Sequence, residues 1–296
     1  MKEKILLDTD IGSDIDDSVC LAYLLKQREC DLLGITTVSG EPVNRAKLAS
    51  VICMAAGRGD IPIYPGVERP ILTPQKQPTA HQSEMLPKWP HETSFPEGEA
   101  VEFMRRTIRA NPGEVTLLGI GPMTNIGLLF AVDPEIPKLL KRLVIMCGVF
   151  TYRYMGDICL TEWNARCDPY ATAIVYNAPV ETVMSIGLDV TGQVAMEKDE
   201  IIRTYTSDLM KVILDFSGVL DGTRKRIIYH DPLAAATIFQ KDICVFKRGN
   251  VTVEMGAGQL EGLTRWTPDP EGNDEIALAV DRERFFKHYF DIVNQA

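Results

Sequence analysis

The sequence lacks paired cysteines and long hydrophobic runs. Its seven cysteines are scattered without a CxxC pair, which argues against a zinc site or a disulfide framework and predicts reduced thiols in a cytoplasmic protein. No segment approaches the roughly 20 apolar residues that a membrane span needs. The first apolar run, residues 5–7, stops at Asp8, so we expect no secretory signal.

The sequence also lacks an excess of positive charge. It has 31 lysines and arginines against 41 aspartates and glutamates, a net charge of −10. An acidic surface offers no counter-charge to a nucleic-acid backbone or an anionic membrane, so we expect neither as a partner. A neutral small molecule or a cation fits this charge better. With 45% hydrophobic residues, the chain can bury a sizeable core.

Short apolar runs alternate with stretches of helical spacing. The runs lie at residues 5–7, 32–38, 115–120, 143–146, 180–186 and 251–253. This alternation predicts an α/β fold with a mainly parallel central sheet flanked by helices. Residues 70–99 show no periodicity, and we interpret them as a long surface excursion and not as a domain linker. We therefore expect residues 1–296 to form a single domain.

Five aspartates follow the first predicted strand within ten positions: Asp8, Asp10, Asp14, Asp16 and Asp17. Any one of them could be an ordinary helix cap, because a carboxylate accepts free N–H groups at a helix start. Together they would repel one another and raise one another's pKa unless a cation neutralised them. Oxygen ligands of this kind favour a hard divalent ion.

Two known metal-binding patterns fit this loop poorly. An EF-hand that began at Asp8 would need other residues where Gly12, Ser13 and Val19 stand. A strand followed by Asp-x-Asp also resembles the haloacid dehalogenase-type magnesium phosphatases. Their usual Thr or Val is Gly12 here, which counts against that alternative without removing it.

Four segments carry a closer resemblance: DTDIGSDIDD at 8–17, IGPMTNIG at 120–127, EWNARCDP at 162–169 and HDPLAAA at 230–236. In this order they resemble the inosine-uridine preferring nucleoside hydrolase family over nearly the whole chain. The resemblance implies a Rossmann-like, nucleoside-hydrolase-like fold and Ca²⁺ as the cofactor. It also implies a ribonucleoside as substrate, cleaved to ribose and a free purine or pyrimidine base, and a homodimer or homotetramer.

The resemblance assigns the metal ligands and the catalytic groups. Asp10 is implied as both a Ca²⁺ ligand and the general base, with Asp17, the carbonyl of Ile120 and Asp231 as the other ligands. His230 is implied as the proton donor to the departing base, a role that suits an imidazole pKa near the working pH.

The pattern around Asp231 has a simpler interpretation. Asp168 and Asp231 each precede a proline and a helical run, so on pattern alone both are helix N-caps. Only the family's placement of a metal ligand in HDP makes Asp231 a ligand, and it leaves Asp168 as a cap.

A second implied set of residues surrounds the sugar. It consists of Asp16 or Asp14 at the 2′-hydroxyl, Glu162 and Asn164 at the ribose hydroxyls, Met146 along the sugar, Asp157 near the 5′-hydroxyl, and His81 as a second histidine of the site. Glu162 and Asn164 are two apart, so in an extended segment their side chains would face the same way. A polar strand edge is the alternative. Trp163 either packs into the core or forms a wall of the site.

Two departures from the family bear on the substrate. Asp157 stands where the family has an Asn near the 5′-hydroxyl, and Glu41 stands where Asn is common. Both would add negative charge near the ribose and repel a 5′-phosphate. These two departures also leave open the alternative that the protein binds nucleosides without hydrolysing them. We expect residues 70–99 and 219–229 to contact the base, whose identity the sequence does not indicate.

Overall fold

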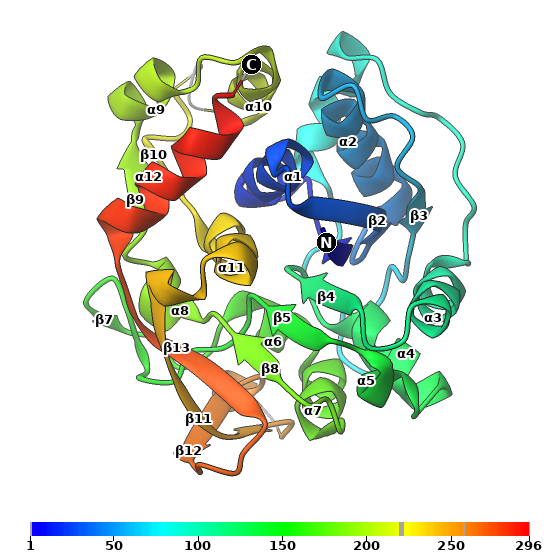
Figure 1. Cartoon of the computed structure of the whole chain (residues 1–296), viewed down its shortest axis with the longest axis vertical. Helices are drawn as coiled ribbons and strands as arrows, with labels where there is room; N and C mark the ends of the chain where they lie inside the picture. Colours follow the sequence, from blue (N-terminus) through cyan, green and yellow to red (C-terminus); the bar gives the residue numbers. More distant parts are fainter. Residues whose placement is uncertain (1, 219–221, 257, 296) are drawn as a thin grey trace.

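In the part of the chain that the structure describes, residues 2–218, 222–256 and 258–295, nine strands form one central sheet (Figure 1). The structure is a computed structural model. The strands in their order across the sheet are β12 (Thr264–Pro268), β11 (Cys244–Val253), β13 (Asp274–Val280), β8 (Val183–Ser185), β5 (Arg142–Ile145), β4 (Val115–Gly119), β1 (Glu3–Thr9), β2 (Cys30–Thr37) and β3 (Ile63–Pro65).

Every strand pair from β3 across to β13 is parallel, and β11 runs antiparallel to both of its neighbours, β12 and β13. The central strands are buried on both sides, with every residue of β4 and β8 buried. Parallel strands covered on both faces need continuous apolar runs. The predicted α/β fold with a mainly parallel sheet is therefore confirmed.

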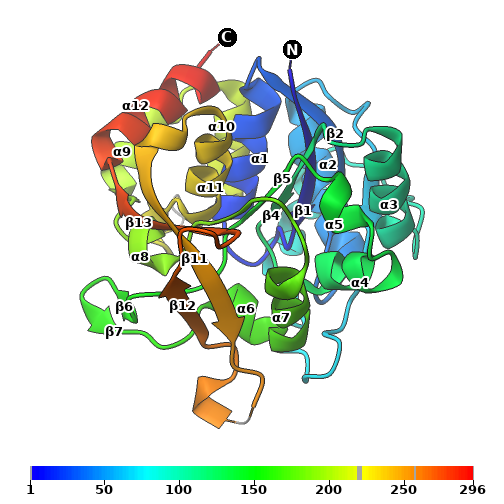
Figure 2. The ribbon, with the colours of Figure 1, turned by 60° about the horizontal axis from the view of Figure 1, so that its bottom comes forward.

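Helices cover both faces of the sheet (Figures 1 and 2). One face packs against α1 (Asp16–Lys26), α2 (Pro42–Ala55), α10 (Asp208–Phe216), α11 (His230–Phe239) and α12 (Arg282–Val293). The other packs against α3 (Ala100–Ala110), α4 (Thr124–Val132), α5 (Ile136–Leu139) and α7 (Pro169–Asn177). None of the described helices is long and apolar enough to cross a bilayer.

The remaining elements are short. They are the hairpin of β6 (Arg153–Tyr154) and β7 (Asp157–Ile158), the hairpin of β9 (Ala195–Glu197) and β10 (Arg226–Ile228), the helices α6 (Trp163–Cys167), α8 (Leu188–Thr191) and α9 (Lys198–Thr204), and the 3-10 turns η1 (His81–Lys88), η2 (Lys241–Ile243) and η3 (Gly258–Leu260). Residues 70–99 are an irregular excursion interrupted by η1, as predicted.

The register of the sheet brings four loops to one edge. Thr9 at the end of β1 pairs with Thr37 at the end of β2, and Asp8 pairs with Gly119 at the end of β4. Gly119 pairs in turn with Ile145, the last residue of β5. In a parallel sheet the loops that follow such strands form the ligand crevice.

Candidate active site

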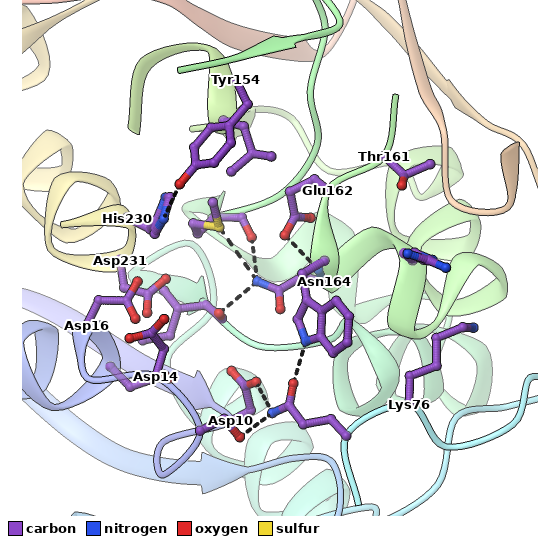
Figure 3. Close-up of a pocket in the computed structure, with 18 of the residues that line it drawn as sticks. Asp10, Asp14, Asp16, Lys76, Tyr154, Thr161, Glu162, Asn164, His230 and Asp231 are labelled. Atoms are coloured by element: carbon purple, nitrogen blue, oxygen red, sulfur yellow. Dashed lines mark hydrogen bonds between the residues drawn. The ribbon is translucent and has the colours of Figure 1, made fainter. Parts of the chain in front are cut away.

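A cavity of about 590 Å³ lies at this edge (Figure 3). Its walls come from the loop after β1, the segment around residues 76–81, the ends of β4 and β5, the segment 154–166 and the start of α11. A volume of this size suits a small organic ligand. Of the residues predicted for the site, it is lined by Asp10, Asp14, Asp16, Asp17, His81, Ile120, Met146, Glu162, Asn164, His230 and Asp231.

Three buried carboxylates meet on the cavity floor. Asp16 and Asp17 begin α1, and Asp231 lies in the first turn of α11, which packs against α1. One carboxylate oxygen from each lies within 4.8 Å of the other two. Burial and the neighbouring carboxylates raise the pKa of all three groups. A divalent cation with oxygen ligands would remove this repulsion.

The positive ends of α1 and α11 favour negative charge at this place. The residue before α1, Ile15, offers no side-chain cap, and neither does Tyr229 before α11. Asp231 is therefore not the N-cap of its helix. Asp168, by contrast, caps α7 by accepting the N–H of Ala171 at 3.0 Å, so its predicted structural role is confirmed.

Asp10 lies outside this group of three carboxylates. Its side chain is only 6% exposed, and its Oδ2 accepts a hydrogen bond from Nε2 of Gln77 at 2.5 Å. Burial raises the pKa of Asp10, and the nearby guanidinium of Arg45 opposes that shift. Arg45 is fully buried and donates to the carbonyl of Asp10 and to Oγ of Ser13. The buried guanidinium of Arg45 thus fixes the position of the acidic loop through these hydrogen bonds.

Asn164 ties two strand ends together. Its Nδ2 donates to the carbonyl of Ile120 at 2.9 Å and to the carbonyl of Met146 at 3.0 Å. These two residues directly follow β4 and β5. Asn164 therefore sets the position of the Ile120 carbonyl, which the family resemblance assigns to the metal.

The expectation of an extended segment at Glu162 and Asn164 is wrong. Glu162 is the N-cap of α6, and its carboxylate accepts the N–H groups of Asn164 at 2.6 Å, Ala165 at 2.9 Å and Gly148 at 3.1 Å. Burial nevertheless raises the pKa of Glu162 to about 7. The two side chains differ in direction because the chain turns into a helix between them.

His230 stands beside the acidic group at the start of α11. Its Nδ1 lies 2.7 Å from Oγ1 of Thr191, and its Nε2 lies 3.5 Å from the hydroxyl of Tyr154 on β6 (Figure 3). Burial lowers the pKa of His230 to about 4, below the value near the working pH that was expected from the sequence. The ring is therefore oriented at one nitrogen by Thr191 and directs the other nitrogen toward Tyr154.

Three predicted residues lie at the rim or away from the cavity. Asp14 is exposed and pairs with Arg224 at 2.6 Å. Asp157 lies on the exposed strand β7, and the carboxylate of Glu41 accepts the N–H of Ala80 at 2.8 Å. Neither Asp157 nor Glu41 lines the cavity. The cavity lining therefore gives their predicted repulsion of a 5′-phosphate no support from direct contact, and that repulsion stays a prediction.

Other lining residues were not predicted. They include Ser13, Lys76, Gln77, Tyr154, Cys159 and Arg166, while Trp163 forms part of the wall and is 47% exposed. Most belong to residues 70–99, which were predicted to be irregular, or to residues 147–168, a second stretch that is unusually aromatic and polar. The length and polarity of these stretches were the only signal in the sequence. Residues 219–221 of the predicted base-contacting segment lie outside the described residues.

A mainly parallel α/β sheet with an acidic cavity at the carboxyl ends of its strands is the arrangement typical of α/β enzymes, whose active sites lie at that edge. A sequence model of the family "Inosine-uridine preferring nucleoside hydrolase" matches residues 5–287, and the chain belongs to that family. The family consists of metal-dependent ribonucleoside hydrolases, which are N-glycosidases, and this protein is an enzyme of that class.

Relatives and solved structures agree with this assignment. The chain is 28% identical over 291 residues to uridine nucleosidase 1 of Arabidopsis thaliana, covering 89% of this chain and 84% of the relative. It is 30% identical over 301 residues to the pyrimidine-specific ribonucleoside hydrolase RihA of Shigella boydii, covering 95% of each chain. The fold matches a purine-preferring ribonucleoside hydrolase from Gardnerella vaginalis with a TM-score of 0.84, 24% identity and 98% coverage of each chain.

Proposed function

We propose that the protein uses Ca²⁺ to hydrolyse the N-glycosidic bond of ribonucleosides, releasing ribose and the free base. The observation that carries this proposal is the buried group of Asp16, Asp17 and Asp231 beside His230 in one cavity. This arrangement supports a cation site and a potential proton donor that face the same substrate space. Such a reaction needs both, because water must be activated and the departing base must be protonated.

The residues present fit a divalent cation. All candidate donors are oxygen atoms, and the carboxylates are buried and repel one another without a counter-charge. We assign Asp10, Asp17, Asp231 and the Ile120 carbonyl as ligands. Asp10 takes the place of Asp16 in this set, following the family resemblance, and its charge contributes to the raised pKa of both Asp17 and Asp231. A set of several oxygens that includes a backbone carbonyl suits Ca²⁺ better than Mg²⁺, which keeps more of its own waters. When bound, the ion supplies a water molecule of lowered pKa and charge neutralisation for the aspartates.

Asp10 is assigned as the general base that takes a proton from the attacking water. Its carboxylate lines the cavity and is held in place by Gln77 and by the Arg45-braced loop. A base acts only from a fixed position within hydrogen-bond reach of the proton that it removes. The fixed loop meets that requirement.

His230 is assigned as the donor to the departing base, with Tyr154 beside its Nε2. Asp16 is assigned to the 2′-hydroxyl. Asp14 is the weaker candidate, because it is exposed and already pairs with Arg224. Met146, Asn164, Glu162 and His81 line the cavity and are assigned to the sugar, whereas the position of Asp157 gives its predicted contact with the 5′-hydroxyl no support.

Two finer points stay predictions from the sequence and the family: the cytoplasmic location and the homodimer or homotetramer. The preferred base has to be found by experiment. Relatives named for uridine and pyrimidines favour a test of uridine first, and the purine-preferring structure with the same fold requires that inosine be tested beside it. The alternative of a dehalogenase-type phosphatase has no support from the family match.

The deciding experiment is a panel of nucleosides and 5′-nucleotides incubated with the purified protein, with Ca²⁺ or with a chelator. Reducing sugar and free base released only with Ca²⁺ would support the proposal. Phosphate release would favour the phosphatase. Ligand binding by calorimetry without any product would instead identify a nucleoside-binding protein that has no turnover.

A further inference from the structure

The side-chain amide of Gln77 uses all of its hydrogen-bonding groups between the acidic loop and α6. Its Nε2 donates to Oδ2 of Asp10 at 2.5 Å and to Oγ of Ser13 at 2.8 Å. Its Oε1 accepts from the indole Nε1 of Trp163 at 2.5 Å. Gln77 is only 7% exposed. An amide offers two N–H groups and one oxygen, so this side chain is fully occupied by protein partners.

The direction of this amide follows from the chemistry of Trp163. An indole N–H is a donor only, so the atom that faces it must be the amide oxygen of Gln77. The amide nitrogen must then face Asp10, whose ionised carboxylate is an acceptor only. The orientation, often ambiguous for a glutamine, is fixed here by its two opposite neighbours.

The backbone of Gln77 is anchored as well. Its N–H donates to Oε1 of Gln75 at 2.7 Å, and its carbonyl accepts from the N–H of Gly40 at 3.2 Å and from Oγ of Ser39 at 3.3 Å. A Cβ atom at Gly40 would lie 2.5 Å from the carbonyl oxygen of Gln77. The glycine therefore permits the close approach of the loop that follows β2 to the segment that carries Gln77.

We propose that Gln77 is a positioning residue that holds Oδ2 of Asp10, so that Oδ1 is presented to the metal ion and the attacking water. Trp163 in turn sets the direction of the Gln77 amide. This inference rests on the proposed role of Asp10. Gln77 itself lies outside the four segments that carry the family resemblance, whereas Asp10 and Trp163 lie within them. The hydrogen bond from the Gln77 amide to Asp10 is drawn in Figure 3.

The first test removes the amide. Gln77→Met keeps the length of the side chain and loses every hydrogen bond, so the Asp10 carboxylate can rotate. We expect kcat for uridine or inosine to fall about 100-fold, since a displacement of about 1 Å at a reacting group can cost that much. KM should stay within about threefold, because substrate contacts are retained. Gln77→Glu keeps the acceptor for Trp163 but directs a second carboxylate at Asp10, and we expect it to be at least as impaired.

The second test removes only the indole N–H. Trp163→Phe keeps the aromatic wall and frees the Gln77 amide to flip, and we expect kcat to fall about 10-fold, a smaller loss than for Gln77→Met. In the double variant, Trp163→Phe should cause no further loss of kcat beyond that of Gln77→Met, because the two residues act on Asp10 through one amide. Trp266→Phe is the matched control. The indole N–H of Trp266 is buried without a partner among the described residues, and Trp266 does not line the cavity, so kcat should not change.

A readout without turnover completes the design. Ca²⁺ affinity measured by calorimetry should weaken in Gln77→Met, and its crystal structure should show the Asp10 carboxylate turned. The inference would be overturned if Gln77→Met had the same kcat and Ca²⁺ affinity as the wild type. It would also be overturned if the losses in kcat of the two single variants added fully in the double variant. If the wild-type protein cleaves no nucleoside, the proposed function fails. The Asp10 orientation in the Gln77→Met crystal then decides the positioning role separately: a turned carboxylate supports it and an unmoved one overturns it.

Discussion

Asp17 and Asp231 bring their carboxylates within 4.8 Å of each other from the first turns of two packed helices. The two residues lie far apart in the sequence. Oδ1 of Asp17 also accepts a hydrogen bond from the hydroxyl of Thr9 at the end of β1. Burying two like charges at this distance destabilises the fold unless a cation is bound. The site should therefore show itself in stability as well as in catalysis.

Metal removal should lower the melting temperature. Ca²⁺ at about 100 times its dissociation constant adds about 2.7 kcal/mol to the free energy of unfolding. Chelation should remove this increment, as measured by calorimetry or fluorescence. Asp231→Asn should melt at a higher temperature than the wild type without metal, because one repelling charge is gone, and should no longer respond to Ca²⁺. An equal Ca²⁺ response in the variant would show that the ion binds elsewhere.

Asp10→Ala should leave the fold intact and nearly abolish turnover. The loss of a general base costs about 10²–10⁴ in kcat, and a lost metal ligand adds to that cost. Circular dichroism checks the fold, and released ribose measures the activity. Asp60→Ala is the control, because Asp60 is exposed and its ion pair among the described residues is with Arg58. A full rate in Asp10→Ala would contradict the assignment.

His230→Ala should lower kcat most for the substrates whose leaving group has to be protonated. Uridine or inosine should lose about 10²–10⁴ in kcat, the usual contribution of a positioned acid. A 4-nitrophenyl riboside should lose far less, since nitrophenolate departs without protonation. Comparing the two substrates on one enzyme preparation makes the measurement independent of folding yield. Equal losses would assign His230 to binding or structure instead.

Asp274→Asn should stabilise the protein in a pH-dependent way. Burial raises the pKa of Asp274 to about 6, although its carboxylate accepts the N–H of Val251 at 2.6 Å. A carboxyl whose pKa is higher in the folded state lowers stability as pH rises through about 4 to 6. We expect a gain of about 1–2 kcal/mol at pH 8, from about 1.4 kcal/mol per pKa unit less the cost of the new amide. Urea unfolding at pH 4 should show most of the gain lost. The same gain at both pH values would refute this explanation.

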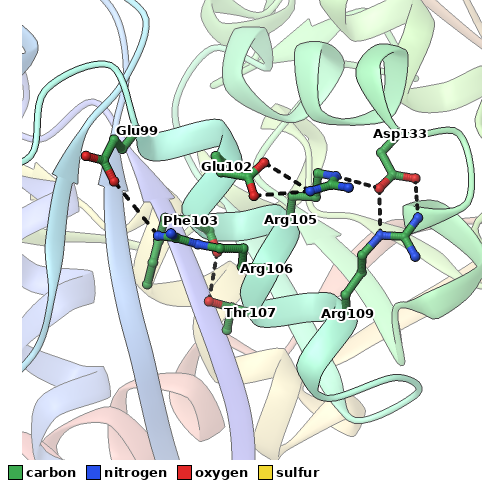
Figure 4. A network of polar contacts seen from close by, with 8 residues as sticks. All are labelled: Glu99, Glu102, Phe103, Arg105, Arg106, Thr107, Arg109 and Asp133. Atoms are coloured by element: carbon green, nitrogen blue, oxygen red, sulfur yellow. Dashed lines mark hydrogen bonds and ion pairs between the residues drawn. The ribbon is translucent and has the colours of Figure 1, made fainter.

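Asp133→Asn should destabilise the protein with the opposite pH dependence (Figure 4). Arg109 contacts both carboxylate oxygens of Asp133 at 2.7 Å, Arg105 adds a bond at 2.8 Å, and together they lower the pKa of Asp133 to about 2. The stabilisation is therefore present above about pH 4 and is lost as pH falls through 2. The melting temperature of Asp133→Asn should be lower than that of the wild type at pH 7 and equal to it near pH 2. Glu102→Gln, which alters only an exposed contact of Arg105, should have little effect.

The sequence predicted the buried parallel strands because they must be apolar on both faces, and the runs at 5–7 and 115–120 became β1 and β4. It did not predict β3, which has only three residues, or β13, whose run begins with Asp274 and Glu275. Both of these acidic side chains are buried, so tertiary partners and not local pattern decide their place.

The acidic loop was predicted as a site because its charge density has no simple structural explanation. Glu162 was placed wrongly because α6 has only five residues, too few to show helical periodicity. The part that Gln77 plays was invisible for another reason. Its partners Asp10 and Trp163 come from remote segments, and nothing in an aperiodic loop encodes their approach.

The most direct test of the cation site is a crystal structure determined in Ca²⁺, with anomalous difference density measured at a wavelength where calcium scatters anomalously. A single strong peak bonded to Asp10, Asp17, Asp231 and the carbonyl of Ile120 is the predicted result. An empty cavity floor, or a peak only on the protein surface, would contradict the proposed mechanism.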